Sequence, residues 1–120
     1  MTLINQTTPI HLVYHQQNKN LIYQITTKLE HRGPDNIGYW FNDNNQVGFG
    51  HTRLSILDLS KKANQPMLSY DSKSIITFNG EIYNHLEMRK DLNNFSSQEI
   101  IWKTNSDTET LINYFNFFGI

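Results

Sequence analysis

Arg53 is the first residue of this sequence that could do chemistry. It lies within the apolar run of residues 47–57, and burying a guanidinium group is costly unless its charge is paired. A carboxylate would be a suitable bidentate partner. From this residue alone, an internal salt bridge and a clamp on a ligand carboxylate are equally good interpretations.

Two further features carry groups that could meet a ligand. Asn79 and Gly80 follow the apolar residues 74–78. Such a pair is most often a hairpin turn, and considered alone it favours that role. An Asn amide beside a Gly backbone N–H also offers two donors to one point, as an oxyanion hole requires.

Asp107 stands at a predicted helix start, where an anion is stabilising in any protein. Its functional interpretation is an anion that faces a substrate ammonium group.

Composition excludes several other functions for the 120 residues. The net charge is −1, without the basic excess of a nucleic-acid binder. No apolar run could span a membrane, and the N-terminal residues lack the basic-then-apolar pattern of a signal peptide, so we expect a cytoplasmic protein. The absence of cysteine excludes disulfides, thiolate metal sites and a cysteine nucleophile. The histidines have no metal-ligand spacing, and there is no glycine-rich phosphate loop, so we expect neither a metal nor a cofactor.

The elements that must position these residues follow from hydrophobic periodicity and stop signals. One helix is predicted over residues 19–31, ended by Gly33 in the left-handed conformation, and a second over residues 81–92. A third begins at the N-cap Ser106, with Glu109 completing a capping box. The expected strands are residues 10–14, 38–41, 47–57, 74–78 and 99–103. Residues 1–9 are expected to be loose and residues 65–67 to be a loop, within one α+β domain over residues 1–120.

Five segments in this order carry a family resemblance. They are His31-Arg32-Gly33-Pro34-Asp35, Arg53-Leu54-Ser55-Ile56-Leu57-Asp58, Gln65-Pro66-Met67, Phe78-Asn79-Gly80-Glu81-Ile82-Tyr83-Asn84 and Asn105-Ser106-Asp107-Thr108-Glu109. Their order and spacing resemble the N-terminal glutaminase domain of glutamine-hydrolysing asparagine synthetases, a class II glutamine amidotransferase. The resemblance runs over about residues 21–119.

The resemblance implies a fold and a set of roles. The fold would be a partial four-layer αββα sandwich of the N-terminal-nucleophile type, that is, an incomplete amidotransferase domain. Arg53 would hold the carboxylate of L-glutamine, Asn79 and Gly80 would form the oxyanion hole, and Glu81 and Asp107 would orient the substrate. The backbone lining the pocket would come from Leu54, Ser55, Ile56 and Leu57. ATP and magnesium would belong only to the synthetase domain, which these residues do not include.

The nucleophile position departs from the family pattern. Thr2 stands where the family has cysteine, and a hydroxyl is a poorer nucleophile unless a base activates it. The first hypothesis is a glutaminase portion, releasing glutamate and ammonia for asparagine synthesis. It would be active only if something supplies the nucleophile and the remaining strands, and a separate synthetase domain or chain would be its partner. The alternatives are a catalytically dead glutamine-binding module and a non-functional gene remnant.

Overall fold

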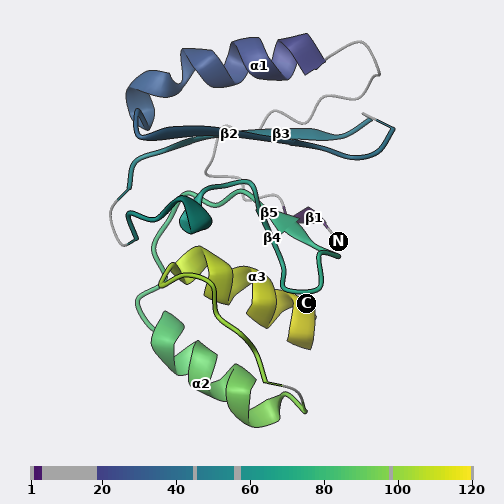
Figure 1. The fold of residues 1–120 in the computed structure, drawn as a ribbon, viewed down its shortest axis with the longest axis vertical. Coiled ribbons are helices and arrows are strands. Elements are labelled where there is room, and N and C mark those ends of the chain that lie inside the picture. Colours follow the sequence, from purple (N-terminus) through teal and green to yellow (C-terminus); the bar gives the residue numbers. More distant parts are fainter. Residues whose placement is uncertain (1, 4–18, 45, 56–57, 98, 120) are drawn as a thin grey trace.

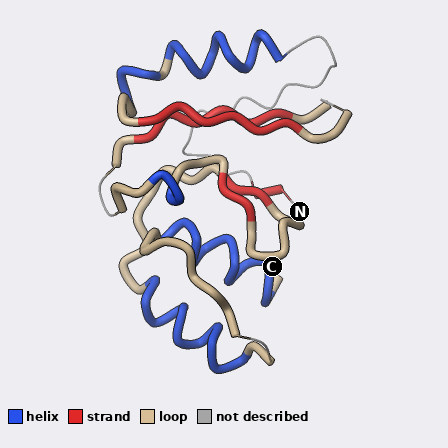
Figure 2. Tube along the Cα trace, in the orientation of Figure 1, coloured by secondary structure: helices blue, strands red, loops and turns tan. Residues whose placement is uncertain are grey.

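The elements of the protein are stacked along its longest axis, as Figure 1 shows for the computed structural model. The structure describes all residues except 1, 4–18, 45, 56–57, 98 and 120. At one end helix α1 (Lys19–Lys28) covers a two-stranded sheet; a three-stranded sheet lies in the middle; helices α3 (Asp107–Phe118) and α2 (His85–Phe95) form the other end. Figure 2 makes the separation of helices from strands plain. The predicted α+β class is confirmed.

The sheet under α1 consists of β2 (Asn36–Phe41) and β3 (Gly48–Arg53), which pair antiparallel along their whole length. Side chains alternate between the two faces of a strand. Toward α1 the face is flat, since a Cβ at Gly50 would overlap Thr26 of that helix. The alternation therefore places Phe49, His51 and Arg53 of β3 on the opposite face, which looks into the body of the molecule.

The middle sheet has the order β1-β5-β4, with β1 (Thr2–Leu3) parallel to β5 (Ile75–Ile76) and β4 (Met67–Leu68) antiparallel to it. Helix α3 packs against this sheet. The shared core is apolar: Met67, Ile76 and Ile112 are buried, with Phe78 and Leu111 against them. This core fixes α3 beside the end of β5, where the loop containing Asn79 begins.

One expectation about this sheet is wrong: residues 65–67 are not wholly loop, because Met67 begins β4. Within residues 1–9, Thr2–Leu3 pair with β5, and residues 1 and 4–9 lie outside the described residues, so their looseness stays a prediction. A two-residue strand has no periodic signal, so only its pairing partner reveals it. The strand expected over residues 10–14 lies outside the described residues.

Helix α1 is shorter than predicted and Gly33 has a different role. A short 3-10 turn (Glu30–Arg32) follows the helix, and Gly33 has φ −160°, which is extended rather than left-handed. A Cβ at Gly33 would lie 2.6 Å from the backbone of Arg53. The glycine is therefore required by close approach to β3, and the left-handed interpretation is wrong.

Ser106 caps α3 as predicted, but the capping box does not close. The Ser106 hydroxyl oxygen accepts the N–H of Thr108 at 3.1 Å. The carboxylate of Glu109 instead accepts from the N–H groups of Lys103 and Thr104, both at 2.8 Å. Residues 99–103 form no strand, so the strand predicted there is wrong. At the end of this segment Glu109 takes the place of a strand partner for the N–H groups of Lys103 and Thr104.

Helix α2 begins at His85, later than the predicted 81–92. The reason is a long-range contact: the N–H of Ile82 donates to the carboxylate of Asp107 at 2.8 Å. This bond holds residues 79–82 as an irregular segment beside the first turn of α3.

Candidate functional site

A cavity of about 430 Å³ lies between the end of β3, the loop after β5 and the first turn of α3. Its volume is typical of small-molecule sites, roughly 300–1,000 Å³. Six of the expected site residues line it: Arg53, Leu54, Asn79, Gly80, Glu81 and Asp107. Other lining residues, not expected from the sequence, include Arg32, His51, Asp58, Gln65, Phe78 and Thr108. Residues up to 76 positions apart in the sequence thus meet at one hollow, as Arg32 and Thr108 do.

Arg53 lies at the inner wall of this cavity. Its side chain is buried and turns toward the loop after β3, where the Nη atoms donate to the carbonyl oxygens of Asp58 and Ser60 and to Oδ1 of Asn64. All three acceptors are neutral. Within the described residues no carboxylate forms a salt bridge with Arg53. Sequence left two interpretations of Arg53, an internal salt bridge and a clamp on a ligand carboxylate. The described part of the chain shows no internal salt bridge for it.

Asp107 is the buried carboxylate of the cavity lining, which also includes the more exposed Asp58 and Glu81. It is the first residue of α3 and is 5% exposed. One carboxylate oxygen accepts from Ile82 N–H, and the Thr108 hydroxyl lies 3.5 Å from the other. A carboxylate can accept about four hydrogen bonds, so Asp107 retains capacity for a further donor. The helix N-terminus stabilises its charge.

Asn79 and Gly80 lie exposed at the rim of the cavity. The hairpin interpretation is wrong, because an irregular segment and then α2 follow them rather than a second strand. Among the described residues, neither the Asn79 side-chain amide nor the Gly80 N–H has a protein hydrogen-bond partner. Both donors are thus available at the edge of the hollow.

The remaining expected site residues are not gathered there. Ser55 is absent from the cavity lining. It lies just after the end of β3, where its N–H donates to the carboxylate of Asp35 at 2.7 Å. Ile56 and Leu57 lie outside the described residues. The backbone of Thr2 pairs with Ile75 at the start of β5, whereas Asn79 follows the end of that strand. In this register the chain direction places Thr2 away from the Asn79 end of β5.

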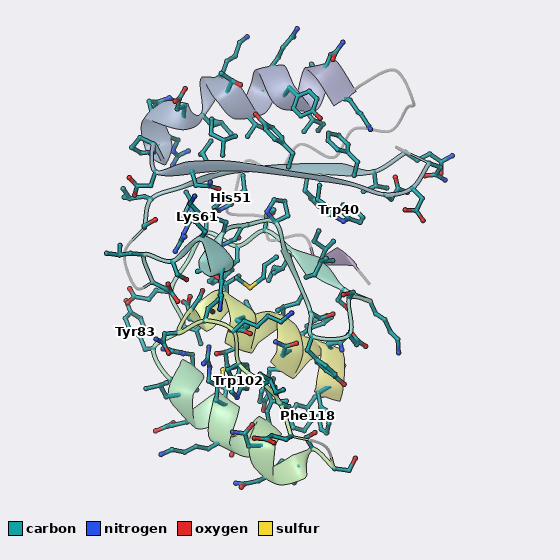
Figure 3. The ribbon with its side chains drawn as sticks, viewed as in Figure 1. Trp40, His51, Lys61, Tyr83, Trp102 and Phe118 are labelled. Atoms are coloured by element: carbon teal, nitrogen blue, oxygen red, sulfur yellow. The ribbon has the colours of Figure 1, made fainter. Side chains whose placement is uncertain are left out.

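His51 is a site residue that the sequence analysis missed. Figure 3 shows it below the β2–β3 sheet, on the face opposite α1. Its pKa is lowered to about 4, chiefly by burial and to a smaller extent by the nearby charge of Arg53, against a hydrogen bond to the Phe78 backbone that raises it. Its buried Nδ1 has no partner among the described residues. The imidazole is therefore neutral at pH 7, and its alternation with Arg53 along β3 was the signal that could have found it.

Asp58 ties the Arg53 side of the cavity to the start of α3. Its carboxylate oxygens accept the N–H of Ser60 at 2.7 Å and the N–H of Asn105 at 2.8 Å. The pKa of Asp58 is lowered, first by the Ser60 hydroxyl, then by these backbone donors, and to a smaller extent by the charge of Arg53, with which Asp58 forms no salt bridge. Asp58 is therefore ionised near neutral pH and bridges two loops that are 47 residues apart.

The described residues contain no group of three or more His, Cys, Asp or Glu side chains arranged to hold a metal ion. None of the helices in the described part of the chain has the length and apolar character needed to cross a membrane.

A buried arginine, a helix-terminal aspartate and free amide donors thus lie around one hollow. Comparison with known proteins gives the class. The family model for the glutamine amidotransferase domain matches residues 8–120, and the chain belongs to this family. The resemblance inferred from the five sequence segments is confirmed.

Individual relatives agree with that family. The chain is 42% identical to asparagine synthetase [glutamine-hydrolyzing] 1 of Bacillus subtilis over 78% of its length. It is 37% identical to amidase chry2 of Gibberella zeae over 85%, and 33% identical to asparagine synthetase [glutamine-hydrolyzing] 1 of Arabidopsis thaliana over 88%. The chain spans only 14–17% of the lengths of these relatives.

Proposed function

We propose that the cavity binds L-glutamine and that the chain is the glutaminase portion of an asparagine-synthetase-like amidotransferase. The reaction is the hydrolysis of glutamine to glutamate and ammonia. One observation carries the proposal: Arg53 and Asp107 are buried, opposite in charge and not paired with each other, and they face the same hollow.

The charges of an α-amino acid match this pair. Arg53 would hold the α-carboxylate, since a guanidinium with neutral partners gains most from an anion. Asp107 would hold the α-ammonium, with Glu81 beside it at the rim. The side-chain amide of glutamine would then reach Asn79 and Gly80, whose donors would stabilise the oxyanion of the tetrahedral intermediate.

The wider setting of this reaction is also proposed. The stack of a helix, two sheets and further helices supports the four-layer αββα architecture of the N-terminal-nucleophile type, built here in part. Ammonia would pass to a synthetase domain or separate chain, which would use ATP and magnesium, in the cytoplasm. No nucleic acid or membrane takes part.

A second candidate is a glutamine-binding module without hydrolysis. Two observations favour it: the sequence contains no cysteine, and Thr2 pairs at the start of β5 rather than beside Asn79. On this hypothesis Arg53 and Asp107 hold glutamine, and no nucleophile attacks it.

Thermal unfolding with and without glutamine tests the binding step. A ligand that binds only the folded state adds RT ln(1 + [L]/Kd), or about 2.7 kcal/mol at a hundredfold excess over Kd. We expect glutamine to raise the Tm of the wild type and not that of Arg53→Ala. Lys62→Ala, which removes an exposed cation outside the cavity, is the matched control and should respond like the wild type. A wild type indifferent to glutamine would refute the proposal.

An ammonia-release assay separates the two candidates. Glutamine-dependent release by the chain together with a synthetase partner supports the glutaminase, whereas binding without release under the same conditions supports the binding module.

A further inference from the structure

Gln65 is a buried polar side chain that joins three parts of the molecule. It is 8% exposed and sits just before β4. Its backbone lies against β2, where a Cβ at Gly38 would overlap the Gln65 carbonyl oxygen. Its side chain reaches the loop after β5 and the first turn of α3. All of these contacts join residues that are far apart in the sequence, so Gln65 links separate segments of the chain around the cavity.

The Gln65 amide forms a two-way contact with the backbone of Phe78. Its Oε1 accepts the Phe78 N–H at 2.6 Å and its Nε2 donates to the Phe78 carbonyl at 3.1 Å. This reproduces the paired bonds of a β-ladder with a side chain in place of a strand. Nε2 also lies 3.3 Å from the hydroxyl oxygen of Thr108. The amide oxygen must face the Phe78 N–H and the amide nitrogen must face the Phe78 carbonyl, so these partners fix which way the amide group points.

These bonds close a ring around the rim of the cavity. Phe78 is held by Gln65, and Ile82 is held by the carboxylate of Asp107. Gln65 and Asp107 are in turn linked through Thr108, the residue that follows Asp107. Only residues 79–81 lie between the two anchored ends.

We infer that Gln65 is a positioning residue that fixes the distance between the donors of Asn79 and Gly80 and the carboxylate of Asp107. The inference rests on the proposed function in one respect: that distance would select the length of the bound amino acid. Glutamine would span it, whereas asparagine, one methylene shorter, would not reach both ends. One methylene is worth roughly 10–200-fold in discrimination where a pocket reads it well.

Gln65→Glu tests the inference with little change of shape. The new carboxylate can still accept the Phe78 N–H but donates to neither the Phe78 carbonyl nor Thr108. We expect the Phe78 and Ile82 amides to exchange hydrogen roughly tenfold faster, because a charged oxygen then opposes a buried carbonyl. Amides within the β2–β3 ladder should be unaffected. The ratio of asparagine Kd to glutamine Kd should fall by roughly fivefold or more.

Two further variants keep the test decisive. Gln24→Glu makes the same change on the exposed face of α1 and should alter neither readout. If Gln65→Glu does not fold, Thr108→Val removes the Gln65–Thr108 link together with the 3.5 Å contact between the Thr108 hydroxyl and Asp107. It leaves both Gln65–Phe78 bonds in place and should accelerate exchange at Phe78 by a smaller factor. The inference is wrong if a folded Gln65 variant, or Thr108→Val where none folds, keeps both the exchange rates and the Kd ratio of the wild type.

Failure of the proposed function would look different. If the wild type binds neither glutamine nor asparagine, that function and the length selection fall together. The exchange rates at Phe78 and Ile82 would still show whether Gln65 holds this segment, since they require no ligand.

Discussion

Two arginines with largely enclosed side chains, Arg89 between the helices and Arg53 at the cavity, show how one residue type serves two purposes. Arg89 lies 3.7 Å from the carboxylate of Glu109 and stacks on the ring of Trp102 at 4.2 Å. It also donates to Thr110, Thr104 and Ser106 at 2.7–2.9 Å. Figure 3 shows Trp102 between α2 and α3, at this junction. The charge and the hydrogen-bonding groups of Arg89 are thus all matched by partners within the protein.

Arg53 differs in what it lacks within the described residues. Its acceptors there are carbonyl and amide oxygens, and its positive charge meets an open cavity. A buried ion pair serves packing, whereas a buried cation with only neutral partners is suited to an anionic ligand. The difference between the two sites, rather than the burial of arginine itself, is the reason for proposing that Arg53 holds an anionic ligand.

The largest effect on stability should come from removing the ion pair between Arg89 and Glu109. Arg89→Ala should lower the free energy of unfolding by roughly 3–5 kcal/mol, because it leaves the Glu109 carboxylate buried without its cation. Arg53→Ala should cost only about 1–3 kcal/mol without ligand, since its lost partners are neutral. Urea denaturation followed by circular dichroism measures both. The exposed Arg32 provides a control, and Arg32→Ala should change little. Equal losses at residues 53 and 89 would contradict the comparison.

An intermediate effect should appear with pH, because His51 shares the inner wall with Arg53. The folded-state pKa of about 4 lies below the ordinary value of 6.5. As the pH falls from 7 to 5 the unfolded chain gains a proton at His51 and the folded protein does not. The folded state should therefore lose about 2 kcal/mol of stability over this window through His51 alone.

Comparison of variants isolates that contribution. His51→Gln should lose about 2 kcal/mol less than the wild type between pH 7 and pH 5 in urea unfolding. His31→Gln, at an exposed histidine, should follow the wild type. An unchanged pH dependence in His51→Gln would mean that the imidazole protonates freely, and that the wall beside Arg53 tolerates a second positive charge.

The smallest effect should come from a surface ion pair. Lys73 lies 3.5 Å from Asp71, but its side chain is 80% exposed. Lys73→Ala should change the free energy of unfolding by about 0.5 kcal/mol or less, since water screens such pairs. A loss comparable to that of Arg89→Ala would show that distance alone, without burial, decides the strength of these pairs.

The sequence by itself determined the features that depend on local interactions. The periodicity of α1, the alternation of β2 and β3 and the N-cap Ser106 all follow from groups within a few residues of one another. The anomaly of Arg53 was also visible, because a charged residue in an apolar strand needs an explanation. The motifs around Asn79 and Asp107 gave the family, which the comparison with known proteins confirms.

Only the tertiary structure decided which partners these residues take. Nothing near Gln65 in the sequence indicates that it bonds to Phe78, nor that Glu109 satisfies the backbone where a strand was predicted. The sequence likewise could not show that Arg53 meets neutral oxygens while Arg89 meets a carboxylate. The physical reason is that hydrogen-bonding capacity belongs to the residue type, but its partner is chosen by packing between segments tens of residues apart.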